Sequence, residues 1–240
     1  MIQIDKLVKS FDKKIVVNIP ALSIGKGEIV GIVGNNGAGK TTFFRLLVDL
    51  ICADNGKVTL MGKNISESEA WKSFTGSFID NSFLIECLRP EEYFAFIGMV
   101  YHISTSDMKE RLKTYDDFMN NEILNQKKYI RDFSAGNKQK IGIIGAMCIH
   151  PKILILDEPF NFLDPSSQIK MNRLFHQLHQ AFNTTILISS HNLNHITDVS
   201  TRILLIEKGL ILKDIDNSKK EAMTELENYF ETNTYNEENK

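Results

Sequence analysis

A glycine-rich stretch followed by a lysine and two threonines has the residue types and spacing of a phosphate-binding loop. Its glycines would let successive backbone amides approach phosphate oxygens, and the helix expected after it would add a positive dipole end. Lys40 should then reach the β and γ phosphates of a nucleotide, and the Thr41 hydroxyl should ligate Mg²⁺. The alternative is a chance glycine-rich turn, which the flanking strand and helix patterns disfavour. The predicted loop comprises Gly34, Asn35, Asn36, Gly37, Ala38, Gly39, Lys40, Thr41 and Thr42.

Two adjacent carboxylates, Asp157 and Glu158, could supply the hydrolytic part of the same site. They follow the apolar run 153–156, and ligands bind at such strand ends in open α/β sheets. Asp157 is suited to hold Mg²⁺ through water, and Glu158 to orient and polarise a water that attacks the γ phosphate. The pair could instead cap a turn. Beside a phosphate loop, however, two carboxylates would repel a nucleotide unless a cation lay between them. The residues therefore predict ATP hydrolysis with Mg²⁺.

The elements that must position these residues have the pattern of an α/β fold. A helix over 168–182 has a well-marked start, because Asp164 can cap its free amides and Pro165 loses no hydrogen bond at the first helical position. The runs on either side of it are short, apolar and rich in β-branched residues, which is typical of buried parallel strands. Such strands are predicted at 28–33, 153–156 and 185–188.

Further segments indicate an antiparallel layer and an inserted helical subdomain. Early strands near 2–8 and 57–61 could form the layer, and strands over 202–206 and 210–213 fit a hairpin closed by Gly209. The predicted fold is a P-loop NTPase core with a mostly parallel sheet, an antiparallel β layer and an inserted helical subdomain. The predicted domain extends over 1–215, with its RecA-like core at about 1–80 and 150–215 and the helical subdomain at about 81–149; a C-terminal helix near 220–230 and a frayed polar tail occupy 216–240.

Composition and charge exclude some classes of protein. The formal net charge is −2 and the pI is near 6.3, so an overall basic field for non-specific nucleic-acid binding is lacking, and no nucleic-acid partner is expected. No apolar run approaches the roughly 20 residues of a membrane span, and the N-terminus lacks the pattern of a signal peptide. We therefore expect a cytoplasmic protein.

The order of these motifs resembles that of the ATP-binding cassette (ABC) ATPases over nearly all of residues 1–213. The segment Phe133-Ser-Ala-Gly-Asn137 resembles the signature loop of that family. The resemblance implies that Ser134, Gly136 and Asn137 meet the γ phosphate of ATP bound by a second subunit. Taken alone, this turn would be an ordinary helix N-cap. It departs from the family at Ala135, where glycine is usual, and at Asn137, where glutamine is usual.

Three further positions gain a role through the resemblance. His191 matches the switch histidine that contacts the γ phosphate and holds the water-orienting carboxylate; otherwise it would be a solvated loop histidine. Asp164 belongs to the segment 161–164, which looks like the loop that contacts the facing subunit. Phe11 matches the aromatic residue that stacks on adenine, and a core or surface aromatic is the alternative.

The loop that usually carries an Mg²⁺-sensing glutamine differs in this chain. The sequence there is Gly76-Ser-Phe-Ile-Asp80-Asn81, and we assign the sensing position and a metal ligand to Asp80, with Asn81 as the alternative. A carboxylate can still ligate Mg²⁺ through oxygen, although it adds negative charge beside Asp157 and Glu158. An acid followed by asparagine resembles the ATP-binding proteins of bacterial export systems for drugs and peptide antibiotics of the bacitracin and lantibiotic type.

The resemblance implies an ATP-hydrolysing transporter subunit. Two copies, as a homodimer, would sandwich two Mg-ATP and drive a separate transmembrane permease, with the chain peripheral on the inner face of the cell membrane. The segment 80–103, including Arg89 to Phe94, would receive a short permease helix, or alternatively would pack within the subdomain. The alternative functions are a soluble non-transport ABC ATPase and a regulatory nucleotide-binding module. The presence of Lys40, Glu158 and His191 disfavours a binder that does not hydrolyse ATP.

Overall fold

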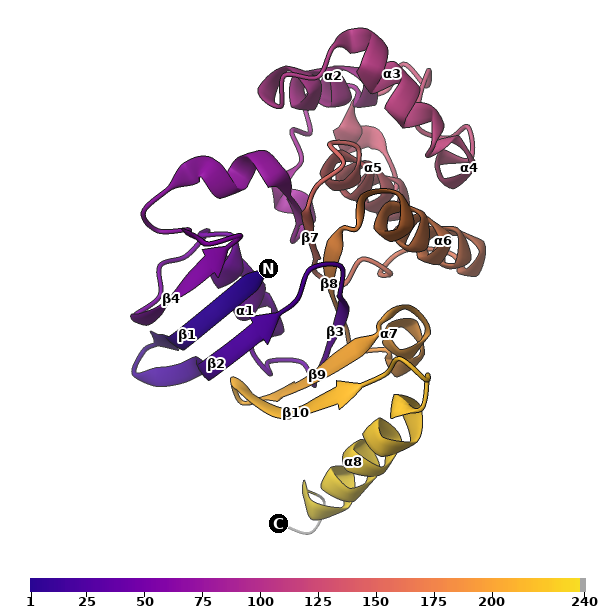
Figure 1. Ribbon diagram of the computed structural model, residues 1–240. Helices are drawn as coiled ribbons and strands as arrows, with labels where there is room; N and C mark the ends of the chain where they lie inside the picture. The colour runs from indigo at the N-terminus through magenta and orange to yellow at the C-terminus, as the bar shows by residue number, and fades with distance from the viewer. Residues whose placement is uncertain (238–240) are drawn as a thin grey trace.

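The computed structural model describes the backbone of residues 1–237 and the side chains of residues 1–231 (Figure 1). In this view the strands occupy the lower left and the centre, and most helices from the middle of the chain lie above and to the right of them. The last part of the expected C-terminal tail, residues 238–240, lies outside the described residues. No helix in the described part of the chain is long and apolar enough to span a bilayer.

The central sheet is mostly parallel, as the sequence predicts. In the described residues it has six strands in the order β10-β9-β3-β8-β7-β6, and only the β9–β10 pairing is antiparallel. The neighbouring strands β3, β8 and β7 are buried along their whole length, which explains the unbroken apolar runs of β3 and β7. The strands are β3 (Ile29–Val33), β6 (Thr75–Phe78), β7 (Ile153–Leu156), β8 (Thr185–Ser190), β9 (Arg202–Glu207) and β10 (Leu210–Asp216).

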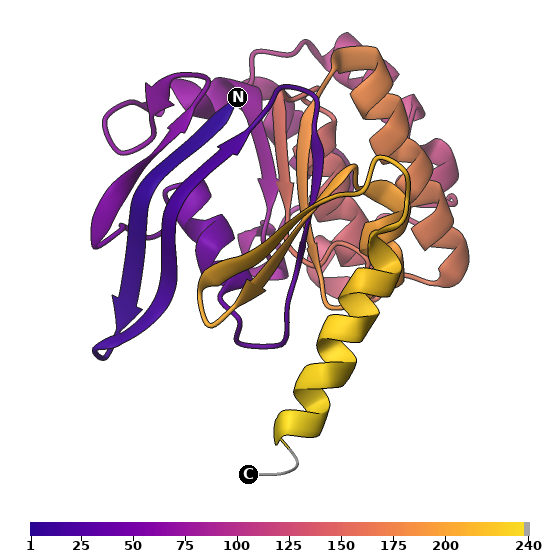
Figure 2. The ribbon, with the colours of Figure 1, turned by 60° about the horizontal axis from the view of Figure 1, so that its bottom comes forward.

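A second, antiparallel sheet lies against the first (Figure 2). Its order is β2-β1-β4-β5, with β1 (Ile2–Phe11), β2 (Lys14–Ile24), β4 (Asn55–Leu60) and β5 (Lys63–Asn64). Helix α1 (Lys40–Leu47) packs with both sheets, because Phe43 and Phe44 share one hydrophobic core with Ile4 of β1 and Ile32 of β3. That packing fixes the start of α1 at the end of β3.

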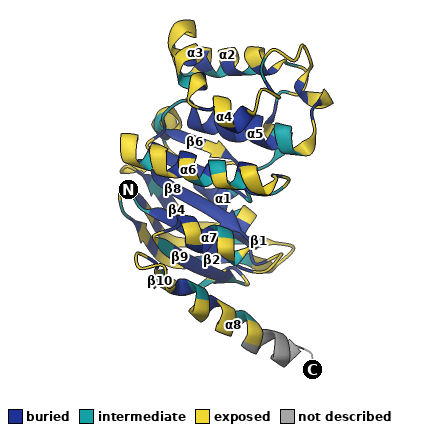
Figure 3. Cartoon of the chain, turned by 90° about the vertical axis from the view of Figure 1, so that its right-hand side faces the viewer, coloured by how far each residue is buried: buried dark blue, intermediate teal, exposed yellow. Residues whose placement is uncertain are grey.

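The other hydrophobic core joins the central sheet to the helices (Figure 3). Helix α5 is buried over most of its length, and it approaches β6 so closely that a Cβ added to Gly142 would lie 2.0 Å from the Phe78 ring. Helix α7 follows β8 and contacts β3. The remaining bounds are α2 (Pro90–Val100), α3 (Thr105–Lys113), α4 (Asp116–Met119), α5 (Ala135–Met147), α6 (Pro165–Phe182), α7 (Leu193–Val199) and α8 (Ala222–Glu237), with short 3₁₀ helices η1 (Glu69–Phe74), η2 (Asn81–Phe83) and η3 (Ile130–Asp132).

Some element predictions differ from the structure. Strand β2 was not predicted from the sequence. It contains Pro20, which it tolerates because it lies at the edge of its sheet among the described strands. Strand β6, with the sequence Thr-Gly-Ser-Phe, has little apolar signal and forms by pairing with β7. Helix α8 continues past the expected end at Phe230 to Glu237, so the first part of the expected frayed tail is helical.

Candidate functional site

The predicted phosphate loop connects the buried strand β3 to the start of α1. Gly39 is the N-cap of α1 and has φ of 107°, a conformation that L side chains rarely adopt; a Cβ there would also lie 2.5 Å from the Val16 carbonyl oxygen. The Lys40 ammonium reaches back over the loop and donates to the Gly34 carbonyl at 2.6 Å and to the Asn35 carbonyl at 3.4 Å. The loop thus holds a buried cation against two of its own backbone carbonyls.

The loop surrounds a small polar cavity of about 230 Å³. Free amides at the start of α1 and the Lys40 ammonium give this cavity a positive character, which suits phosphate oxygens. Besides residues of the loop, its wall includes Glu158, which follows the carboxyl end of β7, and Val16 of β2. The lining consists of Val16, Asn36, Gly37, Ala38, Gly39, Lys40, Thr41, Thr42 and Glu158.

Asp157 lies just behind this cavity and is almost fully buried. The Thr41 hydroxyl donates to its Oδ2 at 2.5 Å, and the Ser189 hydroxyl donates to its Oδ1. Burial raises the pKa of the Asp157 carboxyl above its ordinary value of 3.8, and the charge of Glu158 acts in the same direction, whereas the hydrogen bonds from Ser189 and Thr41 act to lower it. A buried carboxylate of this kind is well suited to a nearby cation.

The oxygen donors present fit Mg²⁺ rather than a metal held by protein alone. Thr41 and Asp157 offer a hydroxyl and a carboxylate in direct contact, which are ligand types that Mg²⁺ accepts. Within the described residues, no group of three or more His, Cys, Asp or Glu side chains could hold a metal ion. A cation bound here would therefore take its other ligands from phosphate oxygens and water, as Mg²⁺ commonly does at nucleotide sites.

Glu158 is held in a constrained position at the mouth of the cavity. Its φ of 46° is in the left-handed region, which is uncommon for a residue other than glycine. The Glu158 amide donates to Ser189 Oγ at 2.8 Å, and Gln139 Nε2 of α5 donates to the Glu158 carbonyl at 3.2 Å. Its Oε1 lies 3.8 Å from Lys40 Nζ, so the carboxylate faces the predicted γ-phosphate position.

His191 contacts the other oxygen of the same carboxylate. Its Nδ1 lies 2.9 Å from Glu158 Oε2, and its backbone amide donates to that oxygen at 3.3 Å. The imidazole is more than half exposed, whereas the Glu158 side chain is 20% exposed. The structure thus brings together five of the predicted residues from distant parts of the chain: Lys40, Thr41, Asp157, Glu158 and His191.

The predicted signature segment lies elsewhere. Ser134 caps α5 by accepting from the Asn137 amide at 3.3 Å, and Gly136 lies against the Phe162 carbonyl, where a Cβ would be only 2.6 Å from the oxygen. In the described part of the chain, Ser134, Gly136 and Asn137 are not among the residues that line the phosphate-loop cavity. The segment does adjoin the 161–164 loop, whose Phe162 side chain is 67% exposed. Both segments thus have surfaces open to a partner.

Asp80 is placed next to the loop helix but is engaged with other groups. Its carboxylate accepts from the Ser82 amide at 2.8 Å and from the Ser82 hydroxyl, and Arg45 Nη2 of α1 donates to it at 3.2 Å. Burial acts to raise the pKa of this carboxyl, but the contacts with Ser82 and Arg45 outweigh it and lower the pKa. The role of Asp80 as a metal ligand stays a prediction, and it requires release from these partners. The side-chain oxygen of the alternative, Asn81, is buried without a hydrogen-bond partner among the described residues.

Phe11 lies at the end of β1 with 48% of its surface exposed. Lys9 Nζ is 5.3 Å from the centre of its ring, within the range of a cation–π contact. A half-exposed ring at a strand end is able to stack on a flat base. The assignment of Phe11 to adenine stays a prediction. Val16, the residue of the second sheet that lines the phosphate cavity, comes from the next strand, β2.

Three side chains that support the site were not found from the sequence. Ser189 bridges Asp157 and the Glu158 amide, Gln139 holds the Glu158 carbonyl, and Arg45 pairs with Asp80. The available signal for Ser189 is its place near a strand end, two residues before His191. Gln139 lies inside α5 and Arg45 inside α1, and neither carries a local sequence signal.

Comparison with known proteins gives a consistent result. Residues 17–161 match the family described as ABC transporter. The chain is 34% identical over 220 residues to the uncharacterized ABC transporter ATP-binding protein YcbN of Bacillus subtilis (strain 168), covering 90% of this chain and 69% of that protein. It is 31% identical to the bacitracin transport ATP-binding protein BcrA of Enterococcus faecalis, covering 91% of this chain and 70% of that protein.

Two other similarities cover nearly the full length of the protein compared. The lantibiotic transport ATP-binding protein SrtF of Streptococcus pyogenes is 30% identical over 228 residues, which is 95% of this chain and 96% of SrtF. A solved dimeric structure of the ATP-binding cassette MJ0796 in a post-hydrolysis state with ADP and Pi superposes with a TM-score of 0.80 at 19% identity, covering 90% of this chain and 99% of that one. The structural likeness supports the predicted P-loop NTPase fold.

Proposed function

The chain belongs to the ABC transporter family, and from that premise we propose that two copies of it close around two Mg-ATP and drive a separate transmembrane permease, as part of an exporter. The chain is an ATP-binding subunit and an ATPase. One observation supports the proposed dimer. A single chain gathers Lys40, Glu158 and His191 at its phosphate cavity, whereas Ser134 lies outside that cavity on the surface. A second copy could bring its own Ser134 to the open side.

Each residue of the cavity has a separate part in the proposed reaction. Lys40 and the loop amides bind the β and γ phosphates, and Mg²⁺, held at Thr41 and Asp157, would neutralise charge on those phosphates. The Glu158 carboxylate orients a water for in-line attack on the γ phosphorus and accepts its proton as the new P–O bond forms and the bond to ADP breaks. His191 keeps the Glu158 carboxylate pointed at that water. The regulatory alternative loses support because all of these groups are in place.

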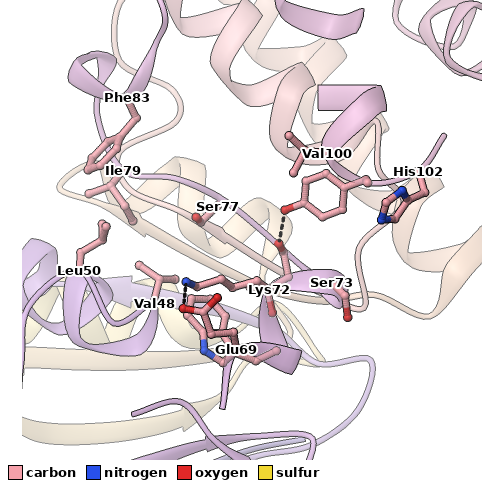
Figure 4. A pocket seen from close by; sticks show the side chains of 13 residues that line it. Val48, Leu50, Glu69, Lys72, Ser73, Ser77, Ile79, Phe83, Val100 and His102 are labelled. Atoms are coloured by element: carbon pink, nitrogen blue, oxygen red, sulfur yellow. Dashed lines mark hydrogen bonds and ion pairs between the residues drawn. The ribbon is translucent and has the colours of Figure 1, made fainter. Parts of the chain in front are cut away.

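A cavity suited to the permease adjoins the Asp80 loop (Figure 4). It measures about 590 Å³ and is walled by the residues after α1, by η1, by β6 and the loop after it, and by the end of α2. Leu50, Phe83 and Val100 expose 44%, 47% and 54% of their surface there, which gives an apolar groove for a short helix. Of the segment expected to form the dock, Phe94 is instead buried in the core. We assign the dock to this cavity, and a permease bound there would hold the chain at the inner face of the membrane.

The exporter assignment rests on the relatives. BcrA and SrtF are named for bacitracin transport and lantibiotic transport, and the chain matches both over at least 91% of its length. The Asp80–Asn81 pair, which the sequence already set apart from the usual glutamine, supports the same subgroup. A drug or peptide-antibiotic exporter is the proposal that follows.

The experiment that tests the proposal is to replace Glu158 by glutamine. Glu158→Gln keeps every group that grips phosphate and removes the proton acceptor, so ATP should bind but hydrolysis should fall by about 100-fold or more. Light scattering after size-exclusion chromatography with Mg-ATP should then show twice the 27.4 kDa chain mass. The matched control is the same variant with Lys40→Ala, which should remain a single chain. Unchanged hydrolysis, or a single-chain mass with ATP bound, would overturn the proposal.

A further inference from the structure

Helix α7 determines where His191 sits. It begins at Leu193, directly after His191 and Asn192, and ends at Val199. A helix of seven residues has little stability of its own, so its position depends on contacts at its ends and along its buried face. Ile196 is fully buried against β3, where a Cβ added to Gly31 would lie 2.2 Å from the Ile196 side chain. At the near end, the Asn192 side chain caps the helix by accepting from the Asn194 amide at 3.0 Å.

The far end of α7 is held by a residue from the C-terminal part of the chain. Asn217, which is fully buried, uses both hydrogens of its side-chain amide to donate to the carbonyls of Thr197 and Ser200, each at 2.9 Å. Its own backbone amide donates to Thr201 at 2.8 Å, and its side-chain oxygen accepts from the Ala222 amide at 3.2 Å. All polar groups of the Asn217 side chain are thus engaged at the junction of α7 and α8.

Lys220 adds a positive charge at the same end of α7. Its ammonium donates to three carbonyls, those of Thr197 at 3.2 Å, Asp198 at 2.9 Å and Ser200 at 3.0 Å. The last carbonyls of a helix have no partner within it and carry the negative end of its dipole, so a cation there satisfies hydrogen bonds and charge together. An ammonium has three hydrogens, and this geometry uses each of them. Asn217 and Lys220 are called the C-terminal clamp below.

We propose that the C-terminal clamp positions His191 for hydrolysis by fixing α7 from its far end. The inference rests on the proposed role of His191 in holding Glu158. Its alternative is that the clamp only anchors α8. Another contact already serves that purpose, since Lys213 of β10 pairs with Glu225 of α8 at 2.6 Å without touching α7. The C-terminal clamp therefore acts on α7. Asn217 and Lys220 are positioning residues for His191.

The test measures steady-state ATP hydrolysis by the full-length Lys220→Met variant. Because the phosphate loop is untouched, KM for ATP should stay within about twofold, while kcat should fall by about tenfold as His191 loses its fixed position. Lys220→Arg keeps a cation with several donors and should recover most of the rate. Lys213→Met, which weakens the anchoring of α8 alone, should hydrolyse ATP like the unmodified chain.

A double-mutant cycle tests whether the clamp acts through His191. If the clamp acts through His191, Lys220→Met should lower kcat by less than about twofold in a His191→Ala background. An unchanged kcat for Lys220→Met, an equal loss in Lys213→Met, or a full tenfold loss in the His191→Ala background would each overturn the clamp. If His191→Ala alone left kcat unchanged, the proposed role of His191 itself would fail, and that result is distinct from failure of the clamp.

Discussion

At the scale of single residues, the position of Glu158 depends on its neighbours more than on its own conformational preference. Its left-handed backbone costs of the order of 1 kcal/mol or more, and persists because the surrounding contacts determine it. Ser189 holds its amide, Gln139 holds its carbonyl, and His191 holds its carboxylate. The backbone cannot relax without breaking these contacts. The direction of the Glu158 carboxylate is therefore set by contacts within the protein itself.

Asp157 gives a residue-scale prediction for stability. Because burial raises its pKa in the folded chain, the stability that the carboxyl contributes is fully present below the unfolded pKa and is lost as pH rises through the folded pKa. At pH 7.5 the ionised group therefore destabilises the nucleotide-free chain. Asp157→Asn should raise the Tm by roughly 2–4 °C, the shift expected for about 1 kcal/mol in a domain of this size.

The measurement is thermal unfolding without nucleotide at pH 7.5 and at pH 4. The gain for Asp157→Asn should shrink as the pH is lowered to 4, because burial makes this carboxyl take up a proton at a higher pH than an ordinary aspartate does. ATP hydrolysis should fall by about 100-fold or more, since a ligand for the cation is lost. A lower Tm for the variant at pH 7.5 would show that the hydrogen bonds from Thr41 and Ser189 outweigh the cost of burial.

Sequence reasoning at this scale finds residues with distinctive patterns and misses those that act through tertiary contact. Lys40 and Thr41 belong to a pattern of fixed spacing, and Asp157 and Glu158 follow an apolar run. Ser189 has no such pattern. Its role comes from the parallel pairing of β7 with β8, which opposes Leu156 to Ile188 and so brings the ends of both strands together.

At the scale of elements, the parallel register explains why the site forms at one edge of the sheet. Strand β3 ends at Val33 before the phosphate loop, β7 ends at Leu156 before Asp157, and β8 ends before His191. These three strands could be predicted because they are buried on both faces and therefore carry apolar runs; the run of β8 is confined to residues 186–188. Strand β6 could not, since pairing with β7 and packing under α5 create it rather than its own composition.

The cavity between η1, β6 and α2 gives the element-scale prediction. Val100→Asp should weaken capture of the permease from solubilised membranes by about tenfold or more, because it places a charge in an apolar groove. ATP hydrolysis by the chain alone should change by less than about twofold, since Val100 does not line the phosphate cavity. The capture is measured by affinity purification of the tagged chain, with retained multi-span proteins identified by mass spectrometry.

Ile169 of α6 provides the control for this prediction. Its side chain is 56% exposed, close to the 54% of Val100, and it does not line the cavity. Ile169→Asp should retain the permease. Equal loss from both variants, or retention by Val100→Asp, would argue against the cavity as the dock. Failure of the unmodified chain to retain any multi-span protein would favour a soluble ABC ATPase.

At the scale of the whole molecule, two hydrophobic cores divide the chain. One joins the antiparallel sheet, α1 and one face of the central sheet, and the other joins the opposite face to the helices. The phosphate loop belongs to the first region and the Ser134 segment to the second, so the two halves of the proposed composite site lie at different places on the surface of each chain. The separation of the phosphate loop from the Ser134 segment becomes visible only in the folded chain. From the sequence alone it could be predicted only through the family resemblance.

Mixing two inactive variants tests the composite site most directly. Lys40→Ala removes the phosphate grip and Ser134→Arg blocks the signature segment, so each alone should lose about 100-fold or more of the ATPase rate. An equimolar mixture should recover about a quarter of the unmodified rate, because half of randomly paired dimers are mixed and each has one intact site. Lys40→Ala mixed with Glu158→Gln should recover nothing, since both changes affect the same half. Full activity of Ser134→Arg alone, or no recovery in the first mixture, would contradict the account.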